Sequence, residues 1–210
     1  MDIYDYSTSG GKNLITEYID SLPQNERLAI YDARKEIRKN GLLAFIKLNT
    51  RQLRGKLWEI KISQTRIMYI IISEDAVFFL NICKKQKGKA EKTELDKAIN
   101  RAKAEGLLWG IYMFVKSDRK KEEEIINEII SSDEKLKLQH DLFEAEMKFK
   151  QSLIEARLAE QLTQNDVSIR SGLSQQAVSR LEKGSGANLD TVIKYLLSIG
   201  YSLSITKISN

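Results

Sequence analysis

The segment Thr163–Gly184 constrains the fold of this 210-residue chain more than any other part of the sequence. Thr163 and Ser174 stand where the N-caps of two successive helices belong, and Gly172 supplies the permissive backbone that a short turn between them needs. Four apolar residues are spaced to pack the two helices together at a steep angle: Val167, Leu173, Val178 and Leu181. We therefore predict a helix-turn-helix within a helical domain over residues 148–199.

This spacing leaves four polar side chains on the outward side of the second helix: Gln175, Gln176, Ser179 and Arg180. Glutamine can pair with adenine through two hydrogen bonds, and arginine can reach guanine or phosphate. Ser174 begins this helix, and Gln164, which begins the preceding helix, is placed to meet a phosphate. These six residues are the predicted DNA contacts. A helical hairpin that binds another protein is the alternative.

The stretch from about Phe149 to Ile199 resembles the helix-turn-helix of the Xre/Cro-repressor superfamily. Three motifs carry the resemblance in order, T-Q-N-D-V at the start, S-G-L-S-Q at the turn and V-S-R-L-E-K-G at the exit. Ser168 stands where alanine is commoner in the family, and it is small enough to fit. The resemblance implies binding to operator DNA.

The first part of the chain, residues 1–110, has the pattern of a mixed α and β module. A strand is expected at Ile3–Tyr6, and apolar residues at helical spacing predict two helices on either side of Pro23, ending at Gly41. Three β-rich runs joined by tight turns follow, over residues 57–62, 66–72 and 76–82. They predict an antiparallel meander, which a helix over Thr93–Glu105 closes.

The rest of the chain is nearly all helical in pattern. Residues 111–147, with a helix over Lys120–Ile130, are expected to link the two modules or to cover the first one. A separate helix at Phe149–Leu162 opens a DNA-binding domain at 148–210. The alternating tail Tyr201–Ile208 predicts a short terminal strand that could pair with a second copy. The predicted fold class is α+β, with helices packed on an antiparallel meander, then an all-α helix-turn-helix domain with a terminal strand.

Charge differs between the two parts of the chain. Residues 1–112 carry 20 Lys+Arg against 14 Asp+Glu, a net of +6, and residues 113–210 carry 14 against 15, a net of −1. A basic surface favours phosphate-rich ligands by counterion release, and a basic module attracts an acidic one. A solvated lysine-rich surface is the alternative explanation of so modest an excess.

Composition excludes several kinds of chemistry. The single cysteine, Cys83, cannot form an internal disulfide, and a single histidine, His140, argues against a histidine base. We expect no metal and no cofactor. The longest apolar run, Ile67–Ile72, is far shorter than the roughly 20 residues of a membrane helix. We therefore expect a reduced, cytosolic protein with no membrane segment.

Six cationic residues lie at or near the ends of the predicted strands: Lys56, Lys61, Arg66, Lys84, Lys85 and Lys87. In a meander these groups can converge into a basic surface that stabilises a pentacovalent phosphate without a metal. Such a surface can support RNA cleavage, because the RNA 2′-hydroxyl is a built-in nucleophile. The alternative is a set of solvent-facing residues at strand ends.

The order of motifs over residues 1–108 is similar to that of the RelE/HigB-type toxins, and closest to their phage-derived branch. The motifs are G-K-L-W-E-I-K, T-R-I-M-Y, K-K-Q-K-G-K and A-I-N-R-A-K. The resemblance implies an endoribonuclease that cleaves mRNA on the ribosome and so inhibits translation. Two residues depart from the family pattern. Thr65 stands where an aromatic residue or glycine is usual, and Glu59 stands where some relatives carry a base.

Site roles follow from the same resemblance. Arg66 would stabilise the scissile phosphate, Lys61 would line the site, and Lys84 and Lys85 would be the charged groups after the last strand. These four are the predicted catalytic residues. RNA binding is expected of two others, Lys56 and Lys87.

A RelE/HigB-type module followed by an Xre-type domain resembles a HigB–HigA toxin–antitoxin pair. The resemblance implies that the antitoxin part neutralises the toxin and represses its own operon. The toxin–antitoxin contact would lie within or between chains. The complex would form a dimer that binds DNA, and Lys120–Lys148 would cover the toxin.

Two questions stay open at this stage. The chain could instead be a transcription regulator whose N-terminal module is inactive and serves assembly, or an RNA-binding adaptor. Met113 could begin a separate protein read in frame, or be an ordinary core methionine.

Overall fold

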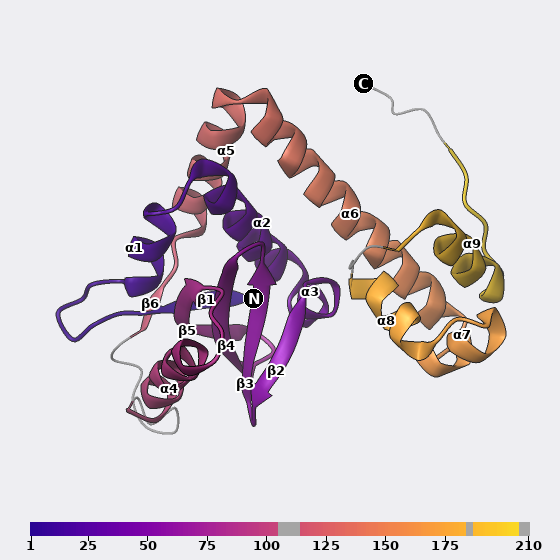
Figure 1. The fold of residues 1–210 in the computed structure, drawn as a ribbon. Helices are drawn as coiled ribbons and strands as arrows, with labels where there is room; N and C mark the ends of the chain where they lie inside the picture. The colour runs from indigo at the N-terminus through magenta and orange to yellow at the C-terminus, as the bar shows by residue number, and fades with distance from the viewer. Residues whose placement is uncertain (105–113, 184–186, 206–210) are drawn as a thin grey trace. The chain divides into compact units, whose positions relative to one another are not determined.

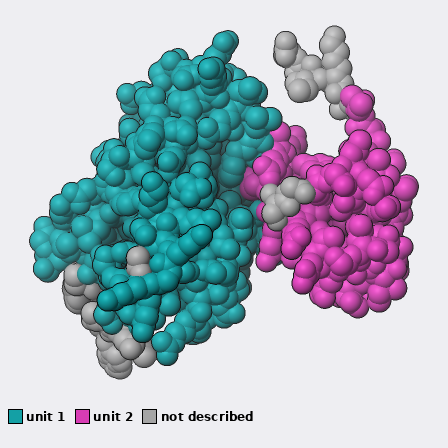
Figure 2. Space-filling view, in the orientation of Figure 1, with its two compact units in different colours: residues 1–144 teal, residues 145–210 magenta. Residues whose placement is uncertain are grey.

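The computed structural model describes residues 1–104, 114–183 and 187–205, and it divides into two compact units. The first unit is residues 1–144 and the second is residues 145–210 (Figure 2). Most of the predicted segment 111–147 groups with the first unit. Met113, where a second protein could begin, lies outside the described residues.

The first unit is built on a six-stranded sheet with the strand order β2-β3-β4-β5-β1-β6 (Figure 1). Its strands are β1 (Asp2–Tyr6), β2 (Thr50–Arg54), β3 (Leu57–Ile62), β4 (Thr65–Ser73), β5 (Ala76–Lys84) and β6 (Phe114–Lys116). Strands β2 to β5 form an antiparallel meander, β1 lies parallel to β5, and β6 lies antiparallel to β1. The predicted meander and the α+β class are confirmed. The sequence pattern missed β2, which is polar, and β6, which has only three residues.

Helices cover both faces of this sheet. They are α1 (Leu14–Asp20), α2 (Gln24–Asn40), α3 (Leu42–Lys47), α4 (Lys89–Ala104) and α5 (Arg119–Ser132). Alternation along the strands directs Met68 and Phe78 to one face of the sheet, into a core with α4. On the other face Tyr69 stacks on Phe45 of α3, and the ring of Phe79 contacts Arg34 of α2. The two predicted helices around Pro23 and their end at Gly41, which has a φ of 56°, are confirmed.

Helix α6 (Glu134–Ala159) corrects one prediction. The sequence predicts a separate helix beginning at Phe149, but α6 is continuous over 26 residues and crosses the division between the units. No glycine or proline interrupts residues 134–159, so nothing in the sequence breaks the helix there.

The second unit contains the end of α6 together with α7 (Gln164–Ser171), α8 (Gln175–Lys183) and α9 (Leu189–Ser198). Thr163 and Asp166 form a reciprocal capping box at the start of α7, and Gly172 ends that helix with a φ of 70°. All four apolar residues predicted to pack the two helices lie in one core: Val167, Leu173, Val178 and Leu181. The predicted helix-turn-helix is confirmed.

One buried ion pair joins all four helices of the second unit. The Arg157 guanidinium donates to both carboxylate oxygens of Glu182, at 2.7 and 3.0 Å. Tyr195 of α9 and Gln164 of α7 donate to the same carboxylate, at 2.7 and 2.8 Å. Burial opposes the charge on Arg157, but the bond and attraction to Glu182 raise the pKa of its guanidinium overall. The guanidinium therefore keeps its charge, and three residues donate hydrogen bonds to the Glu182 carboxylate.

The tail does not form the predicted strand within the described residues. Residues 201–205 carry no strand, and residues 206–208 of the prediction lie outside the described part. An extended segment becomes a strand only when a neighbouring strand takes up its backbone hydrogen bonds, and none does so for residues 201–205. Within the described ranges, no helix is both long and apolar enough to span a membrane.

We predict that Arg157→Met lowers the free energy of unfolding of the second unit by about 3 kcal/mol or more, because it leaves the Glu182 charge buried without its main partner. Urea unfolding followed by circular dichroism measures this. Lys194→Ala is the matched control, since Lys194 forms only an exposed ion pair with Asp190 and should change stability by less than about 1 kcal/mol. Equal losses in both variants would contradict the role of the buried pair.

Candidate functional site

A cleft of about 290 Å³ opens on the first unit beside strands β2 to β5 and the start of α4. Its wall is rich in charge. The lining residues are Arg51, Glu59, Lys61, Arg66, Met68, Cys83, Lys85, Gln86, Lys87, Glu91 and Glu94. Five cations and three carboxylates therefore surround one space.

Strand register brings the predicted cations into this cleft. Lys61 of β3 pairs with Arg66 of β4, and Arg66 pairs with Cys83 of β5, so the three side chains share one face of the sheet. The turn between β3 and β4 is tight, with Ser63 at a φ of 48°. The backbone of Lys85 donates to the carbonyl of Gln64 in this turn at 2.5 Å, which fixes the chain just beyond β5 against it.

Arg66 is half-buried, and its guanidinium donates to two backbone carbonyls of the turn. The distances are 3.1 Å to Ser63 O and 2.8 Å to Thr65 O. Both bonds use the same nitrogen, Nη1. Within the described residues the other two guanidinium nitrogens have no such bond, so they can donate to an anion in the cleft.

Glu59 is a buried carboxylate in this cleft that the prediction of catalytic residues did not include. Only 3% of the residue is exposed, and Arg51 Nε lies 2.8 Å and Lys61 Nζ 3.8 Å from its Oε1. The alternation of L-W-E-I-K, which puts Glu59 on the same face as Lys61, was the available signal. Arg51 could not be found in this way because β2 itself was missed.

Cys83 lies in the same cleft and is buried. Burial raises the pKa of its thiol to about 11. The nearby carboxylates of Glu94 and Glu59 also raise this pKa, whereas Arg66 lowers it. The thiol is therefore protonated at neutral pH and is a poor nucleophile.

The predicted RNA-site residues divide into two groups. Lys61, Arg66, Lys85 and Lys87 line the cleft. Two residues are not among those that line it, Lys56 in the turn between β2 and β3 and Lys84 at the end of β5. Lys84 pairs in register with Thr65, on the face opposite Arg66 and Cys83, so the alternation of the strand directs it away.

The predicted DNA surface is mostly exposed in the second unit. Gln175, Gln176 and Arg180 are exposed and Ser179 is half-buried, all on α8. The Ser174 hydroxyl accepts from the backbone N–H of Ala177 at 3.2 Å, as an N-cap does.

The side chain of Gln164 does not lie where the predicted set of DNA contacts requires it. The sequence places its side chain toward a phosphate, but the amide nitrogen donates to the buried Glu182 carboxylate at 2.8 Å. The side chain is therefore engaged in joining α7 to α8. The partner lies 18 residues further along the chain, where spacing within one helix gives no signal.

Residues 114–144 bind the first module through a buried charge cluster centred on α5. Arg34 of α2 donates to both oxygens of Asp5 at 2.9 Å and, through Nε, to Glu122 at 2.8 Å. Arg38 pairs with the second oxygen of Glu122. Burial opposes the Arg34 charge, but Asp5 and Glu122 raise the pKa of its guanidinium well above the usual value.

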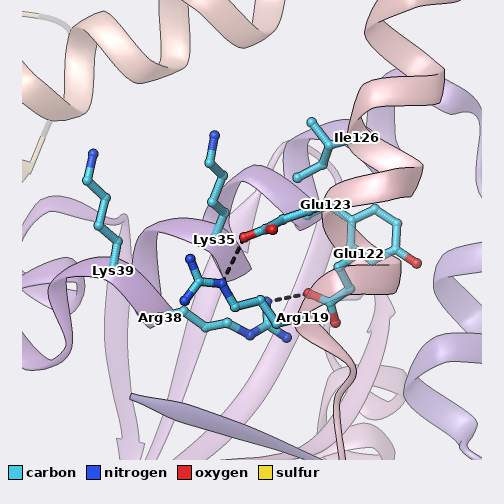
Figure 3. Close-up of a pocket in the computed structure, with 8 residues that line it drawn as sticks. Lys35, Arg38, Lys39, Arg119, Glu122, Glu123 and Ile126 are labelled. Carbon is cyan, nitrogen blue, oxygen red and sulfur yellow. Dashed lines mark hydrogen bonds and ion pairs between the residues drawn. The ribbon is translucent and has the colours of Figure 1, made fainter.

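Figure 3 shows α2 and α5 facing each other across a pocket of about 320 Å³ beside this cluster. The α2 side contributes Lys35, Arg38 and Lys39, and the α5 side contributes Arg119, Glu122 and Glu123. Cations of one helix therefore face carboxylates of the other, which favours the docked arrangement.

Further contacts extend along β6 and α6. The Ser117 hydroxyl and backbone N–H both donate to Ile3 O, at 3.0 and 2.9 Å, while β6 extends the sheet. His140 Nδ1 of α6 lies 2.5 Å from Asp32 Oδ1 of α2. Burial raises the pKa of Asp32 to about 6 although His140 lowers it. The segment thus contacts both the sheet edge and α2.

Comparison with known families follows the two-unit division. Residues 17–103 match the family described as Phage derived protein Gp49-like (DUF891), and residues 153–205 match the family described as Helix-turn-helix. The chain joins a Gp49-like domain to an Xre-type helix-turn-helix domain. This confirms the predicted pairing of a RelE/HigB-type toxin module with an Xre-type module. The curated proteins compared with the sequence include no match.

We predict that iodoacetamide alkylates Cys83 more than about 100-fold more slowly at pH 8 than it alkylates a free thiol of ordinary pKa near 8.5, because the raised pKa leaves little thiolate. The rate should climb as the pH approaches 11. Intact-mass spectrometry of the folded chain over time measures both rates. Labelling at pH 8 as fast as glutathione would contradict the burial of this thiol.

Proposed function

We propose that the Gp49-like domain is a metal-independent endoribonuclease that cleaves mRNA on the ribosome. The second unit then binds operator DNA and represses its own operon, and residues 114–144 restrain the nuclease. The observation that carries the nuclease proposal is the cleft in which Lys61, Arg66 and Lys85 surround the buried carboxylate of Glu59.

The chemistry of this cleft suits cleavage of RNA. A base removes the proton from the RNA 2′-hydroxyl, the oxygen attacks phosphorus, and the bond to the 5′-oxygen breaks to leave a cyclic phosphate. Protonated lysine and arginine cannot be the base, whereas the Glu59 carboxylate can accept this proton. Arg66 and Lys61 stabilise the charge that develops on the phosphate, and a cleft lysine returns a proton to the leaving oxygen.

The restraint acts away from this cleft. The residues that line it come from positions 51–94, and the residues described between 114 and 144 bind α2 and the strand β1 instead. We therefore propose that the segment prevents the domain from docking on its large substrate, rather than filling the cleft.

DNA binding rests on the exposed face of α8. Gln175, Gln176 and Arg180 stand on a helix held by a full core and by the Glu182 ion pair, so the helix that carries them is in place before any ligand arrives. Such a helix can enter the major groove and read base edges.

A regulator with an inactive first domain is the second candidate. The observation in its favour is that Arg51 and Lys61 already face Glu59, so part of the positive charge of the cleft is neutralised within the protein. In that case the Gp49-like domain would serve assembly alone.

We predict that residues 1–112, added alone to a translating extract, cleave mRNA and stop synthesis, while the full chain does so far less. Arg66→Ala and Glu59→Gln should each lower the cleavage rate by about 100-fold or more, because each removes a group that acts on the transition state. Primer extension on the mRNA gives the rate.

The matched control for this test is Lys56→Ala, which removes a cation that is not among the residues lining the cleft. It should keep most of the activity. If residues 1–112 leave protein synthesis unaffected while retaining a folded circular dichroism spectrum, the inactive regulator is favoured. RNA binding without cleavage would favour an adaptor.

We predict that changing Gln175, Gln176 and Arg180 together to alanine abolishes specific binding to DNA from the promoter of the gene's own operon. The loss should be on the order of 100-fold in affinity, because each good base contact discriminates by about 1–3 kcal/mol. Gel-shift titration at one fixed salt concentration measures it. Lys194→Ala, on α9, should bind as the unchanged chain does, and unaltered affinity of the triple variant would refute the assignment.

A further inference from the structure

The pocket between α2 and α5 has no part in the proposed cleavage of RNA or binding of DNA. Its volume of about 320 Å³ is that of a site for a small molecule, since such pockets run from about 300 to 1,000 Å³. We refer to it as the α2–α5 pocket. Four cations against two carboxylates line it, a net charge of +2 that favours an anion: Lys35, Arg38, Lys39, Arg119, Glu122 and Glu123.

Arg38 and Glu122 of this pocket neutralise each other. Arg38 Nη1 pairs with Glu122, and Arg38 Nη2 donates to the Ser117 hydroxyl at 2.5 Å. Glu122 also accepts from Arg34 at 2.8 Å, and the side chains of Arg38 and Glu122 are each only 10% exposed. The charges that can change partner are therefore those at the rim, which are Lys35, Lys39, Arg119 and Glu123.

Carboxylates of the protein itself lie against two of the rim cations. Glu123 accepts from Arg119 Nε at 2.8 Å, and Glu144 of α6 pairs with Lys35 at 2.8 Å. The hydrogen bond from Arg119 lowers the pKa of Glu123, and the charge of Lys35 adds to this effect. Burial acts to raise the pKa of Glu144, but the hydrogen bond and charge of Lys35 lower it overall. The rim therefore has a positive potential that stabilises negative charge from more than one helix.

These ion pairs are exposed, so a more highly charged anion can displace them. The side chains of Lys35 and Glu144 are 37% and 39% exposed, and those of Arg119 and Glu123 are 73% and 42% exposed. Ion pairs at such positions stabilise a protein only slightly. Lys39 forms no ion pair with any residue that the structure describes. Figure 3 shows Lys35 and Lys39 extending to the same side from neighbouring turns of α2.

We propose that the α2–α5 pocket binds a small anion with two linked phosphate groups, contacted by Lys35 and Lys39 of α2 and by Arg119 of α5. A phosphate group carries about −1.5 to −2 charges at pH 7, so two of them bring more charge than the two carboxylates that they displace. Cations spread over two helices suit an extended diphosphate better than a single compact ion. The buried side chains of Tyr31 and Ile126 form an apolar part of the wall, against which the organic part of a nucleotide can pack.

Such an anion bridges the Gp49-like domain and the segment that restrains it in the proposed function. Two of its contacts belong to α2, whereas Arg119 lies in the first turn of α5, so the site is complete only while α5 is docked. A ligand that binds one of two states stabilises that state. The anion therefore strengthens the hold of α5 on the domain, and a fall in its concentration weakens that hold. This regulation rests on the proposed function, whereas the binding site does not.

Isothermal titration calorimetry of the full chain, at one fixed ionic strength, tests the site with pyrophosphate and with ADP. Inorganic phosphate and sulfate should bind about ten-fold more weakly or worse, because each makes fewer charge-assisted hydrogen bonds. Adenosine should not bind. Pyrophosphate as tight as ADP would identify the diphosphate alone as the ligand, and tighter ADP would identify a nucleotide. Sulfate as tight as pyrophosphate would mean an adventitious ion only and would overturn the proposal.

Variants locate the bound anion. Lys39→Ala and Arg119→Ala should each weaken pyrophosphate binding by about ten-fold or more, because each removes a charged donor. Lys121→Ala, exposed on α5 but not among the residues that line the pocket, is the matched control and should bind normally. Glu123→Ala should tighten binding, because a competing carboxylate is gone, whereas Glu124→Ala, outside the pocket lining, should not. Affinity that none of the three pocket variants changes would overturn the proposal.

The basic cleft beside β2 to β5 can also attract phosphate, so the titration is repeated with the Arg66→Ala chain. Binding that persists in this variant and weakens with Lys39→Ala assigns the anion to the α2–α5 pocket. Binding that disappears with Arg66→Ala and survives Lys39→Ala would place the anion in the cleft and overturn the proposal.

Hydrogen exchange of the full chain, followed by mass spectrometry, measures the effect on α5. With pyrophosphate at about 100 times its dissociation constant, amides of α5 that exchange on undocking should exchange about 100-fold more slowly, while those of α8 should not change. Unchanged exchange in α5 despite binding would overturn the bridge between the helices. A chain that binds the anion and protects α5 but cleaves no RNA would refute the proposed nuclease and leave this site intact.

Discussion

The arrangement of the first unit depends on the buried guanidinium of Arg34. It is bound on one side by Asp5 of the first strand and on the other by Glu122 of α5, with 1% or less of the Arg34 and Asp5 side chains exposed. An unpaired charge at this depth costs several kcal/mol, so the N-terminal strand, α2 and the segment after the Gp49-like domain stabilise one another. The domain and its proposed restraint therefore meet in one buried ionic cluster rather than at a surface ion pair.

The second unit repeats this principle with Glu182, which binds groups from three other helices. Its effect differs, because here the ion pair fixes the helix that carries the exposed Gln175 and Arg180 side chains. Rigid support of this kind would reduce the ordering cost of the DNA binding that we propose for this helix. The cleft of the Gp49-like domain instead presents charged groups directly to the RNA that we propose it cleaves. The two units thus use buried charge and exposed charge for separate tasks.

Local signals in the sequence predicted much of this fold. The Thr163 cap, Gly172 and the alternating strands each depend on neighbouring residues, and these elements form as expected. Contacts between distant residues could not be read in this way. Arg34 and Glu122 are 88 positions apart, and the ion pair of Glu59 requires Arg51 from a polar edge strand. For the same reason the strand-end pattern named lysines that line the cleft and lysines that do not, and it could not tell Lys84, which faces away, from Lys85.

Cutting the chain between the Gp49-like domain and residues 114–144 shows whether that segment holds the domain. A protease site placed within residues 105–113 allows the backbone to be cleaved between the two pieces. Size-exclusion chromatography then shows whether the pieces stay together. We expect the two pieces to co-elute. Glu122→Ala should let them separate, whereas Glu123→Ala, at the rim of the pocket, should not. Pieces of the unchanged sequence that separate as soon as the chain is cut would contradict it.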